Sequence, residues 1–370
     1  MKKYKMLVVC PHPEKMAPGQ RLKYEQYFED FRRNNIEVTV KSFMTVRFQN
    51  VVYKKGHFLE KIFWTLYGYW QRFILLFSIR RYDISYIFLW VTPFGPPFFE
   101  WMYTKLSRKV VYDIDDLVYL KGVKSKANPI STALKGRNKP IYMMKHADRV
   151  ITCTPYLDEF VRKYNNNTTD ISSTINTEKY IPKTDYTLRE GKAIFGWSGS
   201  LSTSRYLHLL DNVFKRLKAD GVQFKVLVMG DESFSIEGIE VEALPWKEEY
   251  EVEVIKRFDI GLYPLPDEEW VLGKSSLKAL QYMGAGVPVI ATAIGTNFRV
   301  MEHASNGLLV KTEDEWVEQL KSLTRDESLR KKLGEKGAQV VEEKFSIHAN
   351  SKVYLGILKN LIAYDRTETK

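Results

Sequence analysis

The chain contains 370 residues, of which 44% are hydrophobic and 27% are charged, so it is long enough for two domains that each bury a core. Its two cysteines exclude a disulfide framework and suit a reducing compartment. The longest apolar stretch, 59–79, is interrupted by Glu60, Lys61 and Arg72 and falls short of the roughly 18 uninterrupted residues of a membrane span. We therefore expect a cytoplasmic protein.

The net charge of +11 is concentrated in one half of the chain. Residues 1–184 contain 31 Lys and Arg against 16 Asp and Glu, whereas the remaining residues contain 25 against 29. A basic half attracts anionic partners such as lipid headgroups, phosphorylated substrates or nucleic acid. A generally solubilising surface is the alternative. Because no nucleic-acid-binding module accompanies the charge, we expect no nucleic-acid partner.

Short apolar runs alternate with longer helical patterns from end to end, which predicts parallel α/β domains. A polar segment with Pro182 and Gly191 is the predicted linker. We expect an N-terminal domain over 1–184, a C-terminal domain over 185–346 and a final helix in 347–370 that crosses back to the first domain. The predicted strands are 5–10, 36–40, 84–90, 109–114, 149–152, 193–197, 224–229, 259–263 and 287–292.

The loop after the first predicted strand, 11–21, has the residue types of a ligand-binding loop. Gly19 allows the backbone to approach a ligand, and Arg21 adds a fixed positive charge. His12 is the histidine that a strand–loop geometry directs toward a binding edge. An ordinary strand–helix loop with a solvent-facing arginine is the alternative.

Residues 58–103 contain 17 aromatic side chains with basic residues among them. Trp and Tyr beside Lys and Arg favour a bilayer interface, so we expect peripheral association with an anionic membrane surface, the inner face of the cell membrane. The alternative is an aromatic core helix, with Phe63, Trp64, Tyr67 and Trp70 at helical spacing, followed by a buried strand.

The strand predicted at 109–114 ends with three carboxylates, Asp113, Asp115 and Asp116, at the edge of the sheet where α/β proteins bind ligands. We expect Asp113 and Asp116 to hold acceptor hydroxyls or to assist a proton transfer. The Asp-x-Asp pattern is also similar to the nucleophile motif of haloacid-dehalogenase-like phosphatases, although that motif normally ends the first strand of its domain.

A glycine-containing turn in the second half, 196–207, follows a predicted strand and opens a helix. Gly199 permits close backbone approach, Ser200 begins a run of capping residues, and the helix start offers free N–H groups to a phosphate. Arg205 adds a charge in the first turn. Capped strand–helix turns are common, so this piece alone is weakly specific.

A second piece, 273–292, places Lys274, Lys278 and Gln281 at a spacing that predicts one shared helix face. Two lysines and an amide suit a diphosphate and a ribose. A solvent-exposed polar face is the alternative.

These two pieces, followed by Gly295 and 306–310, resemble in order and spacing the C-terminal domain of family-4 retaining glycosyltransferases. The resemblance implies an α/β GT-B fold, in which two Rossmann-like, doubly wound domains face each other across a cleft. It implies metal-independent transfer of a hexose from a nucleotide-sugar donor to a glycan or lipid-linked acceptor, with retention of configuration, in polysaccharide or glycan biosynthesis. No cofactor is implied, because basic side chains and helix termini neutralise the diphosphate.

The resemblance also implies roles for single residues. Arg205 occupies the position of a diphosphate-binding lysine, and Ser200 that of an arginine, whose charge we expect Lys274 and Lys278 to supply.

Of the further donor contacts that the resemblance implies, Gly19 and Arg21 face the phosphates from the N-terminal domain, and Gly199, Gln281 and Gly295 complete the site. The chain departs from the family at Gly273 and Gln281, where glutamates are usual, and at Arg299.

Two other functions of the same architecture stay open. A non-catalytic nucleotide-sugar-binding protein would account for the missing glutamates. A nucleotide-sugar epimerase would need a cleft rich in carboxylates and histidines, for which His12 alone is available.

Overall fold

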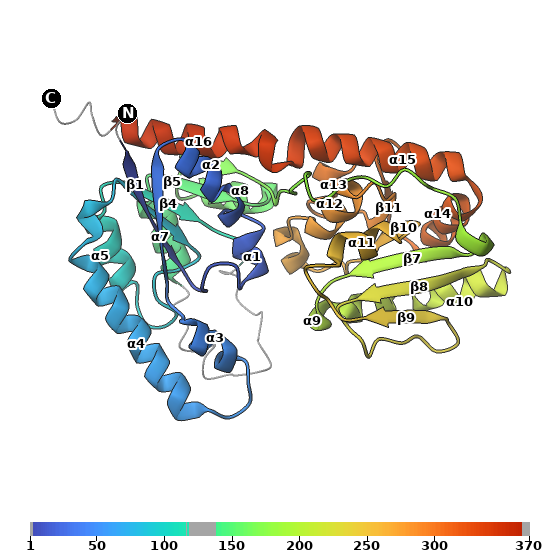
Figure 1. Cartoon of the computed structure of the whole chain (residues 1–370), viewed down its shortest axis with the longest axis horizontal. Coiled ribbons are helices and arrows are strands. Elements are labelled where there is room, and N and C mark those ends of the chain that lie inside the picture. Colours follow the sequence, from blue (N-terminus) through green and yellow to red (C-terminus); the bar gives the residue numbers. More distant parts are fainter. Residues whose placement is uncertain (1–2, 116, 118–137, 365–370) are drawn as a thin grey trace. The chain divides into compact units, whose positions relative to one another are not determined.

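The computed structural model describes residues 3–115, 117 and 138–364 (Figure 1). Asp116, one of the expected acceptor residues, lies outside the described residues. The chain divides into two compact units, one formed by 1–172 with 350–370 and the other by 173–349. The boundary precedes the predicted linker because Ile175 and Tyr180 are buried in the core of the second unit.

The N-terminal unit is built on a six-stranded parallel sheet with the strand order β2-β1-β3-β4-β5-β6. Strand β1 pairs with both β2 and β3, so that Met6 lies opposite Val38 on one side and Ile84 on the other. The strands are β1 (Tyr4–Cys10), β2 (Ile36–Ser42), β3 (Ile84–Phe88), β4 (Val110–Asp113), β5 (Arg149–Thr152) and β6 (Thr168–Asp170).

Helices cover this sheet and bury its apolar side chains. The C-terminal helix α16 (Ile347–Tyr364) contributes to the same unit, since Tyr354 packs on Tyr27 and Ser351 donates a hydrogen bond to Asp30. The other helices of the unit are α1 (Pro18–Arg21), α2 (Phe28–Arg33), α3 (Val46–Val52), α4 (Phe58–Leu76), α5 (Phe98–Leu106), α7 (Asn138–His146) and α8 (Pro155–Arg162).

The C-terminal unit repeats the design with the strand order β12-β11-β10-β7-β8-β9, again all parallel. Its strands are β7 (Ala193–Ser198), β8 (Phe224–Met229), β9 (Val241–Leu244), β10 (Ile260–Tyr263), β11 (Val289–Thr292) and β12 (Leu308–Val310). Its helices are α9 (Leu201–Ser204), α10 (Asp211–Ala219), α11 (Glu251–Lys256), α12 (Leu277–Gly284), α13 (Asn297–Val300), α14 (Glu313–Arg325) and α15 (Glu327–Val340).

Each predicted strand is present, with ends that differ by two residues or fewer. The strands β6, β9 and β12 were not predicted. Each has three or four residues and lies at the edge of its sheet, so its apolar pattern is too short to be distinguished from a loop.

Helix α4 turns most of its aromatic side chains to the surface. Phe63, Tyr67 and Trp70 are 60%, 38% and 59% exposed, so the alternative of an aromatic core helix is wrong, whereas the strand expected after it, β3, is buried. The buried side of α4 is formed instead by Gly68, Arg72, Leu75 and Leu76. Among the described residues, no helix has the length and apolarity that crossing a bilayer requires.

Candidate functional site

The strand order of the C-terminal unit defines where a ligand is expected to bind. Strand β7 lies centrally in the sheet. The chain adds β8 and β9 on one side of β7 and then crosses over to add β10, β11 and β12 on the other, so the strand order switches between the neighbours β7 and β10. In open α/β sheets, ligands bind outside the carboxyl ends of the strands at such a switch point. The loops that follow β7, β10 and β11 are therefore the candidate site.

The turn after β7 is packed so closely that only glycine fits. A Cβ on Gly199 would lie 2.5 Å from the Trp197 ring and 2.7 Å from Cε of Lys278, and a Cβ on Gly230 would lie 1.7 Å from the Gly199 carbonyl oxygen. Gly230 also has a φ of +110°, which residues other than glycine rarely adopt. The backbone of the turn is thus held against the end of β8.

Ser200 begins helix α9 as its N-cap. Its side chain and that of Thr203 form a capping box, with the Ser200 N–H donating to Thr203 Oγ1 at 3.3 Å. The first N–H groups of a helix have no partner within it, and its amino end is electropositive. The capped turn therefore presents a positive end at the edge where the strands finish.

Lys278 is the central cation of this edge. It lies in the first turn of α12, and its Nζ sits 4.6 Å from the centroid of the Trp197 ring and 5.9 Å from that of Tyr263. It donates a long hydrogen bond, 3.4 Å, to Thr203 Oγ1. No carboxylate of the described residues pairs with it. Burial, and secondly the neighbouring charge of Lys274, lower the pKa of Lys278 to about 8.

Arg205 and Lys274 each lie over an aromatic ring, Tyr206 and Trp270 respectively. The Arg205 guanidinium lies 4.9 Å from the Tyr206 ring, which is 5.4 Å from Trp270, and Lys274 Nζ lies 5.6 Å from Trp270. Aromatic rings hold cations without neutralising their charge. Arg205 has no carboxylate partner among the described residues, so its charge, like that of Lys278, stays available to an anion.

The expected shared helix face is wrong for Lys274. Helix α12 begins only at Leu277, because Ser276 adopts a left-handed conformation with a φ of +58° and breaks the turn before it. Lys274 instead follows the 3₁₀ turn Glu269–Gly273. It still reaches the neighbourhood of Lys278, whose pKa it lowers.

Gln281, which the resemblance assigns to the ribose, is already hydrogen-bonded to another side chain of the protein. It is buried on α12, and its Nε2 donates to the hydroxyl of Tyr180 at 2.7 Å. That hydroxyl donates to Glu251, which also accepts from the indole N–H of Trp246 at 2.8 Å. Where the resemblance implies a ribose ligand, the structure has a member of a buried hydrogen-bond chain.

Gly295 lies in the loop after β11, at the same edge. Its φ is +53°, and an added Cβ would contact Leu272 and Val271 at about 3.5 Å. The next residues are held inward, since Asn297 donates to the Thr292 carbonyl at 2.8 Å and accepts from Ser276 at 2.7 Å. This links the β11 loop to the start of α12. Arg299 is exposed on α13.

The expected loop of the N-terminal unit follows β1 and is organised by hydrogen bonds of a buried glutamine. Gln20 is fully buried and binds His12 twice, accepting from its N–H at 2.9 Å and donating to its carbonyl at 3.0 Å. The His12 ring contacts Gln49 Oε1 at 2.7 Å. Gly19 and Arg21 lie on α1, where a Cβ on Gly19 would be 3.4 Å from Asp115.

Asp113 lies at the end of β4, but its side chain is fully buried. It forms an ion pair with Lys23 and accepts a hydrogen bond from Tyr86. Burial raises the pKa of Asp113 above its ordinary value, although Lys23 opposes the shift. The carboxylate ties Lys23, which follows α1, to the sheet. Because its side chain is buried in these contacts, Asp113 is not part of the proposed acceptor site.

Several residues of the candidate site escaped the sequence analysis. Trp197 and Tyr263 form the aromatic floor under Lys278, and Tyr282 fixes α12 to β7 by accepting from the Ser198 N–H at 2.7 Å. Aromatic residues at helix and strand positions look like core residues in a sequence, and only their proximity to a lysine that has no carboxylate partner in the described part of the chain distinguishes them. Within the described residues, no three His, Cys, Asp or Glu side chains form a metal-binding group.

Solved structures define the class of fold. The chain superposes on sucrose-phosphate synthase from Thermosynechococcus elongatus with a TM-score of 0.71 and 16% identity, covering 98% of this chain and 100% of the other. HepE from Anabaena, solved with UDP and glucose, matches with a TM-score of 0.67, 13% identity and coverage of 96% and 100%. The lipopolysaccharide outer core galactosyltransferase WaaB matches with a TM-score of 0.65 and 13% identity, covering 96% of this chain and 99% of the other. The fold is that of GT-B glycosyltransferases, as expected.

A family model narrows this class for the C-terminal unit. Residues 192–326 match the family described as glycosyl transferases group 1. The matched segment runs from the first strand of the unit to the start of α15, and so includes the whole edge that carries Arg205, Lys274 and Lys278. No curated protein matches the chain significantly.

Proposed function

We propose that the protein is a retaining glycosyltransferase of family-4 type that binds a nucleotide-sugar at the carboxyl edge of β7, β10 and β11. The observation that carries the proposal is Lys278, a half-buried cation with no carboxylate partner among the described residues, held on two rings beside Lys274. A diphosphate would supply the missing negative charge and restore the pKa of Lys278 toward its ordinary value. HepE, of the same fold, was solved with UDP-glucose, which makes a uridine nucleotide the first candidate.

In this proposal, protein cations replace a metal ion. Arg205, Lys274 and Lys278 stabilise the charge that develops on the leaving nucleoside diphosphate, and the amino end of α9 adds its positive dipole. Gly199, Ser200 and Gly295 shape the backbone around the donor, while Gly19, Arg21 and His12 belong to the N-terminal loop that we assign to donor and acceptor contacts. Gln281 reaches a ribose only if it leaves Tyr180. Transfer in the presence of EDTA is the expected result.

The acceptor is proposed to be a glycan or lipid-linked sugar in polysaccharide or glycan assembly, with the protein peripheral to the inner face of the cell membrane. The basic character of residues 1–184 supports an anionic partner for the N-terminal unit.

The proposal is tested by thermal unfolding with UDP, GDP, ADP, CMP and their sugar conjugates, without added metal. A ligand at a hundred times its Kd stabilises the folded state by about 2.7 kcal/mol, which is readily visible. We expect one nucleotide to stabilise the protein and Lys274→Ala/Lys278→Ala to lose the effect, with Lys215→Ala/Lys332→Ala as the control. An unfolding temperature that no nucleotide raises would contradict the proposal.

Binding without turnover would point instead to a non-catalytic nucleotide-sugar-binding protein. Donor hydrolysis or transfer, and its loss in Lys278→Ala, separates the two. The anomeric configuration of the product, read by NMR, tests retention.

A further inference from the structure

Helix α4 has an inverted distribution of side chains. Figure 1 shows it as the long helix along one side of the N-terminal unit, and α5 contacts it. A helix on the surface of a protein normally turns its apolar side inward and its charges outward. In α4 an arginine points inward, while ten large apolar or aromatic side chains on and directly after the helix are more than a third exposed: Phe58, Leu59, Ile62, Phe63, Leu66, Tyr67, Trp70, Phe73, Ile74 and Phe77. We call these ten residues the apolar face.

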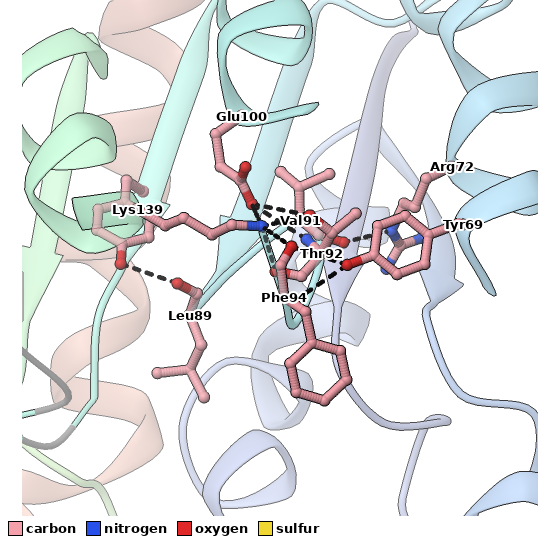
Figure 2. Close-up of polar contacts among 9 residues, drawn as sticks. Tyr69, Arg72, Leu89, Val91, Thr92, Phe94, Glu100 and Lys139 are labelled. Atoms are coloured by element: carbon pink, nitrogen blue, oxygen red, sulfur yellow. Dashed lines mark hydrogen bonds and ion pairs between the residues drawn. The ribbon is translucent and has the colours of Figure 1, made fainter. Parts of the chain in front are cut away.

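The rotation of α4 is fixed by polar contacts on its inner side (Figure 2). Arg72 is 1% exposed and donates to the carbonyl oxygen of Val91 at 2.9 Å, as Figure 2 shows. It also donates to the carbonyl oxygens of Cys10 at 2.9 Å and Lys41 at 3.0 Å. Tyr69 donates to the Phe94 carbonyl at 2.8 Å and accepts from its N–H at 3.1 Å. Turning the helix to bury the apolar face would break all of these hydrogen bonds, so the fold holds the face outward.

The loop that receives these contacts is itself anchored. Lys139 reaches from α7 to the Thr92 and Phe94 carbonyls, each at 2.9 Å, and forms an ion pair with Glu100 at 3.3 Å (Figure 2). Gly68 adds a steric lock, because a Cβ there would lie 2.6 Å from the Phe43 ring. The exposed position of the apolar face is therefore a built feature of the unit.

Cations bracket both ends of the apolar face. Lys54 and Lys55 are exposed before its first residue, and Arg80 and Arg81 are exposed after its last. Residues 46–109 contain ten Lys and Arg against three Asp and Glu. Of the three acids, Glu100 is buried, Asp83 pairs with Arg108, and Glu60 with His57.

We propose that α4 lies in the surface of an anionic bilayer, with the apolar face among the acyl chains and the flanking cations on the lipid phosphates. Aromatic residues and a polybasic rim are the combination that such surfaces bind. A second copy of the chain fits less well, because a two-fold contact through this face would bring the same four cations together. The inference concerns the N-terminal unit and stands whether or not the C-terminal unit transfers a sugar. A lipid-borne acceptor would follow from it only with the proposed function.

Flotation of the purified full chain with vesicles tests the proposal. The vesicles are phosphatidylcholine alone and phosphatidylcholine mixed with phosphatidylglycerol. We expect binding to the mixed vesicles that weakens with salt, and about a tenfold lower partition coefficient for Phe63→Ser/Trp70→Ser and for Lys54→Glu/Lys55→Glu. Phe63→Leu/Trp70→Phe should retain binding, which separates apolarity from damage to the fold.

The matched controls are Ile181→Ser/Val353→Ser, which removes two exposed apolar side chains elsewhere, and Lys215→Glu/Lys332→Glu, which reverses two exposed charges. Both should float like the parent. Parent protein that stays off every vesicle, Phe63→Ser/Trp70→Ser that binds as the parent does, or a dimer in solution that this variant dissociates would each overturn the proposal. Nucleotide stabilisation of the same variants reports separately on the C-terminal unit.

Discussion

Two cations withdrawn from solvent, the buried Arg72 of α4 and the half-buried Lys278 of α12, serve different purposes. Neither has a carboxylate partner among the described residues, and burial lowers the pKa of each. Arg72 donates to three backbone carbonyls at 2.9–3.0 Å. Lys278 lies over two rings and, within the described part of the chain, donates one long hydrogen bond, to Thr203. A buried cation whose donors are satisfied holds a fold together, whereas one whose donors are not satisfied is prepared for a ligand.

The largest effect is expected at Arg72. Arg72→Met removes the hydrogen bonds that the guanidinium donates to the carbonyls of Cys10, Lys41 and Val91; of these, the Cys10 carbonyl still accepts from the Phe43 N–H at 2.8 Å. The free energy of unfolding should fall by about 3–5 kcal/mol, measured by urea denaturation. Arg33→Met is the control, because Arg33 is 72% exposed and its change should stay within about 0.5 kcal/mol. A loss below about 1 kcal/mol for Arg72→Met would show that water or another donor replaces the guanidinium.

Lys278→Met should have effects of opposite sign on stability and binding. Without ligand, removal of a half-buried cation that no described carboxylate neutralises should raise the free energy of unfolding at pH 7 by about 1–3 kcal/mol. Nucleotide affinity should fall by about 2 kcal/mol, roughly thirtyfold, measured by calorimetric titration. Lys215→Met is the control and should change neither quantity. A destabilised Lys278→Met protein would assign Lys278 to the fold and contradict the comparison.

The pH dependence of stability and of nucleotide affinity, compared between the parent and Lys278→Met, sharpens this test. The pKa of Lys278 is lowered from 10.5 to about 8, so between these values the unfolded chain binds more protons than the folded one. The free energy of unfolding of the parent, relative to Lys278→Met, should therefore rise from pH 8 to pH 10. Nucleotide affinity should fall above pH 8, by at most about tenfold per pH unit, because only the protonated amine pairs with a phosphate. Lys278→Met should show neither trend.

The smallest of these effects concerns Gly199. Gly199→Ala places a Cβ 2.5 Å from the Trp197 ring and 2.7 Å from the Lys278 stem, both of which must shift to admit it, so we expect nucleotide affinity about tenfold lower. Gly356→Ala is the control, because nothing lies within 4 Å of its added Cβ and a helix gains about 0.5–1 kcal/mol from the change. Unchanged affinity in Gly199→Ala would place the nucleotide away from this turn.

Much of the fold was predictable because it depends on local patterns. Buried parallel strands such as β1 and β8 are continuous apolar runs between polar turns, and their boundaries follow from that contrast. The edge strands β6, β9 and β12 were not, since each is short. At the site, the sequence indicated Arg205, Lys274 and Lys278 by charge, but not the rings that hold them, because Trp197 and Tyr263 are equally typical of a core.

By itself, the sequence determined the α/β class, the alternation of strands and helices, the excess of positive charge in residues 1–184, and the cations of the candidate site, because these depend on composition and spacing along the chain. The tertiary structure alone decided that Asp113 is buried against Lys23, that Gln281 bonds Tyr180, and that the aromatic side of α4 faces outward. These outcomes depend on partners distant in sequence. Arg72 rotates α4 by binding three carbonyls from other segments, and helical spacing alone does not specify which side of a helix the rest of the fold will hold inward.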